Sequence, residues 1–160
     1  MNQSIKVQKT VTINRAPQEL YRCWRNFENL PQFTKHLKSV KVYNDHRSHW
    51  ITSGVVDRSI EWDADIVEDR ENELIRWATV EGGDVSHSGL IEFRPTPNDR
   101  GTVVRAVLEY DSPAGAIGDT IAKLFGEAPE QQLGDDLSRF KMLMEAGEIA
   151  TTEGQPHGAQ

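Results

Sequence analysis

The sequence is poor in cysteine and has no long run of apolar residues. Its 160 residues include one cysteine, Cys23, so an internal disulfide is excluded and we expect a reducing, cytoplasmic setting. No stretch approaches the roughly 20 apolar residues that a membrane-spanning helix needs. Residues 1–15 alternate polar and apolar side chains, a pattern that does not predict a secretory signal.

Familiar catalytic and metal-binding patterns are missing as well. The sequence has no zinc-type spacing of His and Cys, no glycine-rich phosphate loop and no nucleophile-elbow motif. Cys23 has no evident base to activate it, so we interpret it as structural. Glu61, Asp63 and Asp65 share one face of a predicted strand and could bind a hard cation, but a solvated acidic face is the preferred interpretation. We therefore predict no metal and no cofactor.

Positive charge is scarce, and it is concentrated in the first third of the chain. The formal net charge of −7 argues against nucleic acid as a partner. Residues 1–56 carry nine Lys/Arg against three Asp/Glu, whereas residues 57–160 carry nine against twenty-two. This asymmetry has two interpretations: two ordinary solvated surfaces, or a basic face for an anionic membrane or an acidic carrier protein.

Hydrophobic periodicity divides the chain into a strand, two short helices, six strands and a long helix. Residues 5–14 alternate apolar and polar side chains, which predicts a half-buried strand. Helical spacing follows in 16–27, where Ala16 is a poor N-cap, and in 28–37. The period then becomes two, and turn residues separate predicted strands at 37–44, 47–54, 60–69, 73–80, 85–95 and 101–111. Their short connections allow only antiparallel neighbours.

The last apolar-periodic run, residues 113–147, predicts a long one-sided helix. Its apolar positions recur every three or four residues; they are Ile117, Ile121, Leu124, Phe125, Ala128, Leu133, Leu137, Phe140 and Met144. Gly126 and Pro129 interrupt the pattern, so we expect a kink or a short break there. Gly147 is the predicted stop.

These elements predict an α+β fold in a single domain, residues 1–150, followed by a mobile polar tail, residues 151–160. A curved antiparallel sheet of six to seven strands would have one wet face and one apolar face. The long C-terminal helix must cover the apolar face. Because a strongly curved sheet rarely closes tightly on one helix, we expect a tunnel between them.

Four segments carry a family resemblance. They are VTINRAPQELYRCWRNFENLPQF (11–33), RSHWITSGVVDRSIEWDADIVED (47–69), RGTVVRAVLEYDSPAGAIGDTIAKLFGEAPEQQL (100–133) and DLSRFKMLMEAGEIATTEGQP (136–156). With the order of elements, they resemble the helix-grip superfamily of START-related and birch-pollen-allergen-like proteins. Within it, the chain is similar to the polyketide cyclase/dehydrase and coenzyme Q-binding START-like branch, and its later segments are similar to one bacterial subgroup.

The resemblance implies an interior cavity for an apolar ligand such as a lipid, an isoprenoid quinone or a polyketide. It supplies no portable catalytic motif, so the chemistry stays open. Ligand pockets of this kind run to roughly 300–1,000 Å³ and have mainly apolar and aromatic walls. The candidate ligand-binding residues are aromatic side chains and two histidines: Trp62, Trp77, His87, Tyr110, Phe125, Phe140, Phe33 and His36.

Among the histidines, His87 is the most informative. If its side of the strand faces inward, it places a titratable group in the cavity beside Gly89, which would leave room for a ligand. The alternative is a histidine that is satisfied by a neighbour or faces solvent. His49 and Trp50 must point to opposite faces, so only one of them can be inside. His36 follows the second helix near the expected cavity mouth, where the alternative is an ordinary surface residue.

Two functions therefore remain open. The favoured hypothesis is a non-catalytic protein that binds or carries an apolar small molecule. The alternative is a cyclase or dehydratase that acts on a polyketide-like substrate, with His87 or His36 as general acid or base. An enzyme of that kind needs several polar groups that converge in the pocket, and the sequence shows one plausible interior histidine without an evident catalytic partner.

Overall fold

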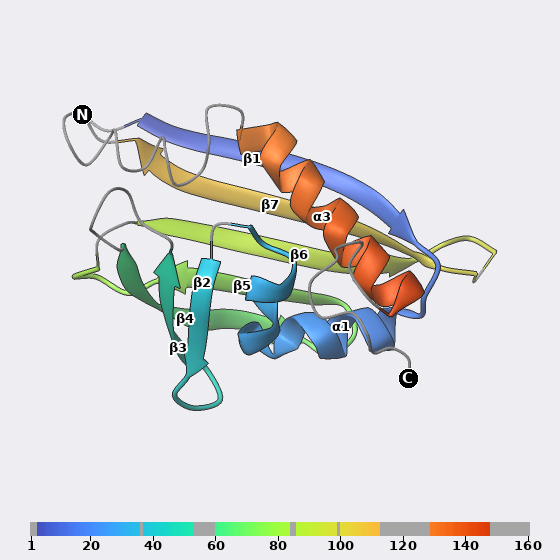
Figure 1. Cartoon of the computed structure of the whole chain (residues 1–160), viewed down its shortest axis with the longest axis horizontal. Coiled ribbons are helices and arrows are strands. Elements are labelled where there is room, and N and C mark those ends of the chain that lie inside the picture. The colour runs from blue at the N-terminus through green and yellow to red at the C-terminus, as the bar shows by residue number, and fades with distance from the viewer. Residues whose placement is uncertain are drawn as a thin grey trace.

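A computed structural model of the chain describes residues 3–35, 37–52, 60–83, 86–98, 100–112 and 129–147. Within these residues, seven strands form one antiparallel sheet, in the spatial order β1-β7-β6-β5-β4-β3-β2. Figure 1 shows the sheet curving around helices α1 and α3, which lie on its concave side. The predicted α+β class and the antiparallel sheet of six to seven strands are confirmed.

The strands follow the predicted alternation closely. Their bounds are β1 Gln3–Ile13, β2 Leu37–Val42, β3 Arg47–Thr52, β4 Glu61–Arg70, β5 Leu74–Thr79, β6 His87–Pro95 and β7 Thr102–Ser112. Strands β2 to β6 each pair with the next strand along the chain, as short connections require. The exception is β1, which pairs along its whole length with β7, the last strand in the sequence order of the sheet.

Side chains on β3 and β4 divide cleanly between the two faces of the sheet. Trp62 and Ala64 are buried on the concave face, while the alternating residues Asp63 and Asp65 are only half-buried on the convex face. On β3, Trp50 is buried and His49 lies on the convex face, which resolves the alternative that the sequence left open. The concave face is therefore the apolar face, as the period of two predicts.

Two short helical segments follow β1. Helix α1, Pro17–Arg25, begins with a proline in its first turn, and Ala16 provides no side-chain cap. Its stability therefore depends on burial of Leu20 and Trp24. The second segment is a single 3-10 helix, η1, at Phe27–Gln32. The helical pattern through residue 37 was predicted too long, because Leu37 already pairs with Thr52 in the sheet.

Helix α3, Pro129–Ala146, packs against β1 on the concave side of the sheet (Figure 1). Leu133, Leu137 and Phe140 are its buried residues, at the spacing that the sequence predicts. Gly147 ends the helix with a φ of 79°, a left-handed conformation that glycine adopts without strain. Residues 113–128 lie outside the described part of the chain, as do the expected break before Pro129 and the tail 151–160.

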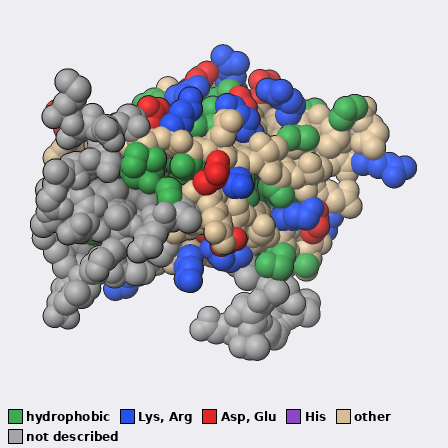
Figure 2. All heavy atoms as spheres, turned by 90° about the horizontal axis from the view of Figure 1, so that it is seen from above, with side chains coloured by type: hydrophobic (Ala, Val, Ile, Leu, Met, Phe, Trp, Pro, Cys, Tyr) green, Lys and Arg blue, Asp and Glu red, His purple; other side chains and the backbone are tan. Residues whose placement is uncertain are grey.

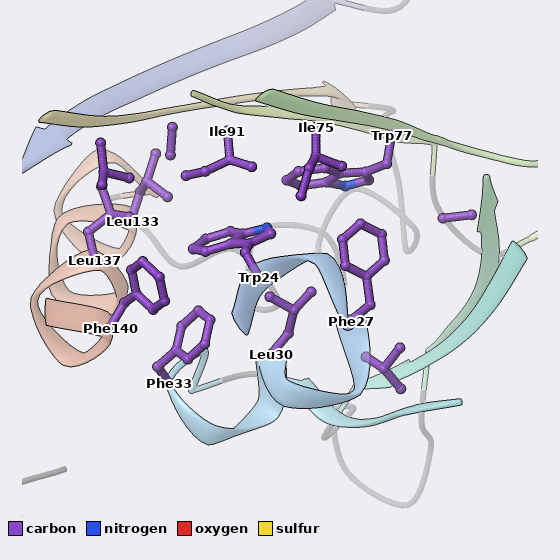
Figure 3. Packing of buried hydrophobic residues seen from close by; sticks show 14 of the residues in the cluster. Trp24, Phe27, Leu30, Phe33, Ile75, Trp77, Ile91, Leu133, Leu137 and Phe140 are labelled. Atoms are coloured by element: carbon purple, nitrogen blue, oxygen red, sulfur yellow. The ribbon is translucent and has the colours of Figure 1, made fainter. Parts of the chain in front are cut away.

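An aromatic cluster joins α1 and η1 to α3. The rings of Trp24, Phe33 and Phe140 lie within 4.8–5.1 Å of one another, centroid to centroid. Figure 3 shows the three side chains meeting between the helices, with Leu133 and Leu137 beside them. Since Phe140 is fully buried and Phe33 is 1% exposed, this cluster is packed core.

The outer surface mixes charges of both signs. On the face seen in Figure 2, Lys/Arg and Asp/Glu side chains are interspersed and do not separate into two fields. No helix in the described part of the chain is long and apolar enough to cross a membrane.

Candidate functional site

An interior cavity of about 100 Å³ lies between the concave face of the sheet, helices α1 and η1, and the first turns of α3. Its lining is mainly apolar and comes from elements far apart in the sequence: Val7, Trp24, Leu30, Thr34, Leu37, Trp50, Thr52, Trp62, Trp77, His87, Ala106, Leu108, Tyr110, Pro129, Gln132, Leu133 and Asp136. All four tryptophans of the chain are among these residues. The cavity is in the expected place, but it is smaller than the expected range.

Three of the tryptophans form one wall of the cavity, which we call the indole wall: Trp50, Trp62 and Trp77. They come from adjacent strands, and Trp50 is the register partner of Trp62. The ring of Trp50 lies 5.9 Å from that of Trp62 at 32° and 6.2 Å from that of Trp77 at 29°. Phe27 packs edge-on against two of these rings, Trp50 at 5.4 Å and Trp77 at 5.6 Å.

His87 closes one end of the indole wall. Its ring stands edge-on to Trp62 at 5.2 Å and to Trp50 at 5.9 Å. The indole N–H of Trp77 donates to its Nε2 across 3.3 Å, so this nitrogen accepts and the proton of the neutral ring belongs on Nδ1. Burial lowers the pKa of His87 to about 4, because the imidazolium ion would lose its hydration there. The side chain is therefore neutral near pH 7.

Gly89 leaves room for the Trp77 ring and not, as the sequence had suggested, for a ligand. A Cβ atom at this position would lie 2.2 Å from Cζ2 of Trp77, far inside contact distance. The space beside Gly89 therefore does not receive a ligand, because the Trp77 ring already fills it. Glycine at position 89 lets the indole lie against the backbone of β6.

Polar side chains gather at the opposite end of the cavity, where α3 meets the segment after η1. These are Thr34, Gln132 and Asp136. The Asp136 carboxylate accepts from the backbone N–H of Lys35 at 3.4 Å and pairs with Arg139. Arg139 in turn donates from Nε to the carbonyl oxygen of Phe33 at 3.0 Å. These bonds fasten α3 to the end of η1 and fix this rim of the cavity.

Four of the eight predicted site residues line the cavity: Trp62, Trp77, His87 and Tyr110. Phe33 and Phe140 lie in the aromatic cluster with Trp24 instead. His36 and Phe125 lie outside the described residues. Burial raises the pKa of the Tyr110 hydroxyl, so it stays protonated near pH 7.

Sequence reasoning did not select Trp24, Trp50 and the polar rim. A usable signal existed for Trp50, because it alternates with His49 and is the more apolar of the two side chains. Its pairing with Trp62 is visible only in the structure. Nothing in a single helix shows which of its core residues, here Trp24, also faces a cavity. The rim depends on how α3 docks against η1, and local periodicity carries no information about that contact.

The other groups that the sequence offered as candidates are buried or paired with neighbouring side chains, as residues with a structural role are. Burial raises the pKa of the Cys23 thiol, which disfavours the reactive thiolate. Asp65 forms a two-bond ion pair with Arg47, at 2.8 and 2.9 Å. His49 lies between Asp63 and Glu61, with its ring nitrogens 2.6 and 2.8 Å from their carboxylates. Among the described residues, no group of His, Cys, Asp and Glu has a metal-binding arrangement.

A larger hollow of about 630 Å³ lies on the outer surface between α1 and the β2–β3 and β4–β5 turns. It is open to solvent and bordered by polar side chains, among them Gln18, Arg22 and Asn72. Arg25 crosses it, with bonds of 2.7 Å to the Asp69 carboxylate and 2.8 Å to the carbonyl oxygen of Asp45. Despite its volume, this hollow lacks the enclosure that an apolar ligand needs, so the interior cavity is the better candidate.

Comparison with known proteins agrees with this geometry. The family described as polyketide cyclase/dehydrase and lipid transport matches residues 13–138. A protein of solved structure from Deinococcus radiodurans is 34% identical over 89% of this chain and 98% of its own, with a TM-score of 0.73. Two more distant structures share the fold. A START superfamily protein from Mycobacterium smegmatis is 20% identical, with a TM-score of 0.64 over 86% of this chain and 98% of that one. The Zhui aromatase/cyclase from a Streptomyces species is 14% identical, with a TM-score of 0.65 over 92% and 100%.

The curved seven-stranded sheet and the C-terminal helix define a helix-grip fold. The chain belongs to the polyketide cyclase/dehydrase and lipid transport family. The helix-grip fold and the family predicted from the sequence are thus confirmed.

Proposed function

We propose that this protein binds an apolar small molecule in the cavity between the sheet and α3. The observation that carries the proposal is the convergence of all four tryptophans on one cavity. Tryptophan is the largest side chain available to fill a core, and here the four indoles surround a cavity.

The energetic cost of the cavity supports a binding role. Cavities lower stability by about 24 cal/mol per Å³, so a volume of about 100 Å³ costs about 2 kcal/mol relative to a filled core. Within the described residues, the indole N–H groups of Trp24 and Trp62 are also buried without a hydrogen-bond partner. Unpaired buried donors reduce stability further. A guest that fills the volume would recover part of this cost.

Catalysis on a polyketide-like substrate is less well supported by the same geometry. A general acid or base works best when its pKa lies near the working pH, and that of His87 is held at about 4. The other titratable groups in the described lining are Tyr110, whose pKa is raised, and Asp136, which is tied to Arg139. Binding is therefore the function that the site favours.

Thermal denaturation with candidate ligands tests the proposal. Long-chain fatty acids, short-tailed quinones and aromatic polyketides should be compared, and a compound at about a hundredfold excess over its Kd adds about 2.7 kcal/mol of stability. The blocking variant is Ala106→Leu, since Ala106 is buried in the cavity lining. Its matched control is Ala78→Leu, which follows Trp77 on β5 and so lies on the convex face.

The proposal predicts that at least one compound raises the melting temperature of the wild type and of Ala78→Leu but not that of Ala106→Leu. If no class of apolar compound shifts the wild type, the protein does not bind ligands in this way. An equal shift in all three proteins would place binding outside the cavity.

A further inference from the structure

Two of the four indole N–H groups find no acceptor within the described part of the chain. They belong to Trp24 and Trp62, and both nitrogen atoms are buried. The two side chains are only 5% and 3% exposed, so bulk solvent does not supply the acceptor. Trp24 extends from α1 toward the sheet (Figure 3), and Trp62 lies on the concave face of β4. The two donors therefore approach the same interior space from the helix side and from the sheet side.

The other two indoles show how a donor in the same lining is paired. The N–H of Trp50 donates to Oγ of Ser48 at 2.8 Å, and that of Trp77 donates to Nε2 of His87 at 3.3 Å. Folded proteins pair the large majority of their buried polar atoms with protein groups or with ordered water. We therefore expect the two unpaired indoles to meet an acceptor that the chain itself does not provide.

Both unpaired donors line the interior cavity, and its size suits water. The volume is about 100 Å³, and a water molecule occupies about 30 Å³ in the liquid, so about three molecules fit. The lining contains polar side chains besides the indoles, among them Thr34, Tyr110 and Gln132. A buried water molecule makes about three hydrogen bonds, and cavities that stay dry have apolar linings. This lining is mixed, so it can hold water.

We infer that the cavity is a hydrated site, in which a cluster of about three ordered water molecules accepts from the indole N–H groups of Trp24 and Trp62. The inference goes beyond the proposed function, because the water is bound in the free protein whether or not a guest follows. Water fits the cavity without any movement of the lining. A guest without an acceptor atom displaces this water and loses its bonds to both indoles.

A high-resolution crystal structure of the free chain tests the site directly. It should show water oxygen atoms about 2.7–3.2 Å from Nε1 of Trp24 and from Nε1 of Trp62. An absence of density beside both nitrogen atoms would overturn the inference. An organic guest whose own oxygen accepts both bonds would overturn it too, but would support the proposed function. Failure of the ligand screen, in contrast, would count against the proposed function and leave the hydrated site intact.

Xenon tests the same site in solution, because it has no acceptor atom and binds in dry apolar cavities. The double variant Trp24→Phe/Trp62→Phe removes both unpaired donors. Its matched control, Trp50→Phe/Trp77→Phe, removes two indoles from the same lining and leaves the unpaired donors in place. In xenon NMR titrations, the first variant should bind xenon about tenfold or more tightly than the wild type, and the control at most about twofold more tightly.

Equal xenon affinity in the two double variants would overturn the inference, because cavity volume and not the two donors would then decide what enters. Far-UV circular dichroism verifies that both variants are folded. If either is not, the single variants Trp62→Phe and Trp50→Phe replace them, since these residues are register partners on adjacent strands. The crystal structure of the wild type decides the question independently of any variant.

Discussion

Trp77 donates its indole N–H to Nε2 of His87 across 3.3 Å, and both side chains are buried in the cavity lining. The bond requires His87 to be an acceptor at Nε2, which the imidazolium ion cannot be. The position of Trp77 in the cavity wall thus depends on the protonation state of His87. The stability of the fold should therefore change when His87 is protonated.

The first prediction concerns acid. The pKa of His87 is depressed to about 4, below the ordinary value of 6.5 that the unfolded chain retains. The neutral form therefore contributes stability above about pH 6.5, and that contribution is lost as the pH falls toward 4. The shift corresponds to about 3 kcal/mol.

Urea unfolding at about pH 7, 5.5 and 4.5 measures this loss. His87→Gln, which cannot become charged, should lose less stability than the wild type over the same interval. The comparison removes the contribution of the carboxylates, which titrate in both proteins. Parallel pH profiles would mean that His87 is not buried in its neutral form.

The second prediction concerns His49, whose contribution to stability should depend on pH in the opposite direction from that of His87. The hydrogen bond to Asp63 is the main cause that raises the pKa of His49, and the bond to Glu61 adds to it. Because the pKa of His49 is raised in the folded state, its ion pairs with the carboxylates stabilise the fold below about pH 6.5. This stabilisation is lost as the pH rises through the pKa that His49 has in the folded protein. His49→Gln should therefore lower the melting temperature at about pH 5.5 and have little effect at about pH 8.5. An equal decrease at both values would assign the effect to packing against Tyr43, whose ring stacks on His49.

The third prediction concerns the core contact of α3. Phe140 is fully buried against Trp24 and Phe33, so Phe140→Ala should cost about 3–5 kcal/mol in the free energy of unfolding. Met142→Ala is the matched control on the same helix, because Met142 is 36% exposed, and it should cost less than about 1 kcal/mol. Chemical denaturation of both variants gives the two values. Similar costs would show that the helix is not held by this face.

The fourth prediction concerns three exposed lysines, one beside the polar rim and two on the edge strand β2. Lys35 lies close to the polar rim, and Lys38 and Lys41 are exposed on the edge strand β2. We propose that they attract an anionic membrane or an acidic carrier protein, so changing all three to Glu should weaken co-sedimentation with anionic liposomes, most clearly at low salt. Neutral liposomes are the control. Identical sedimentation of wild type and variant would mean that these lysines belong to an ordinary solvated surface.

Local patterns were sufficient to predict most of the fold. The alternation around Trp62 placed β4 correctly on both faces, and the spacing of Leu133, Leu137 and Phe140 identified the buried face of α3. The second helix was predicted too long because Leu37 continues its helical spacing. Pairing with β3 decides that position, and this is a tertiary contact that no local window contains.

The candidate site was harder to predict than the fold, because cavity and core have the same composition. Trp62 and Phe140 look alike in the sequence, yet one lines the cavity and the other fills the aromatic cluster. Gly89 shows the same limit: a glycine in a strand indicates a close approach, but not whether a ligand or Trp77 makes it. Only the register of β5 against β6 decides this question.

The central claim is that a small apolar molecule occupies the cavity, and native mass spectrometry tests it most directly. The full chain and its Ala106→Leu variant should be purified from the protein's own host under gentle conditions. The account predicts an added small-molecule mass on the wild type that is absent from the variant and is removed by organic extraction. A wild-type spectrum with only the mass of the chain, together with no stabilisation by any apolar compound, would contradict the account.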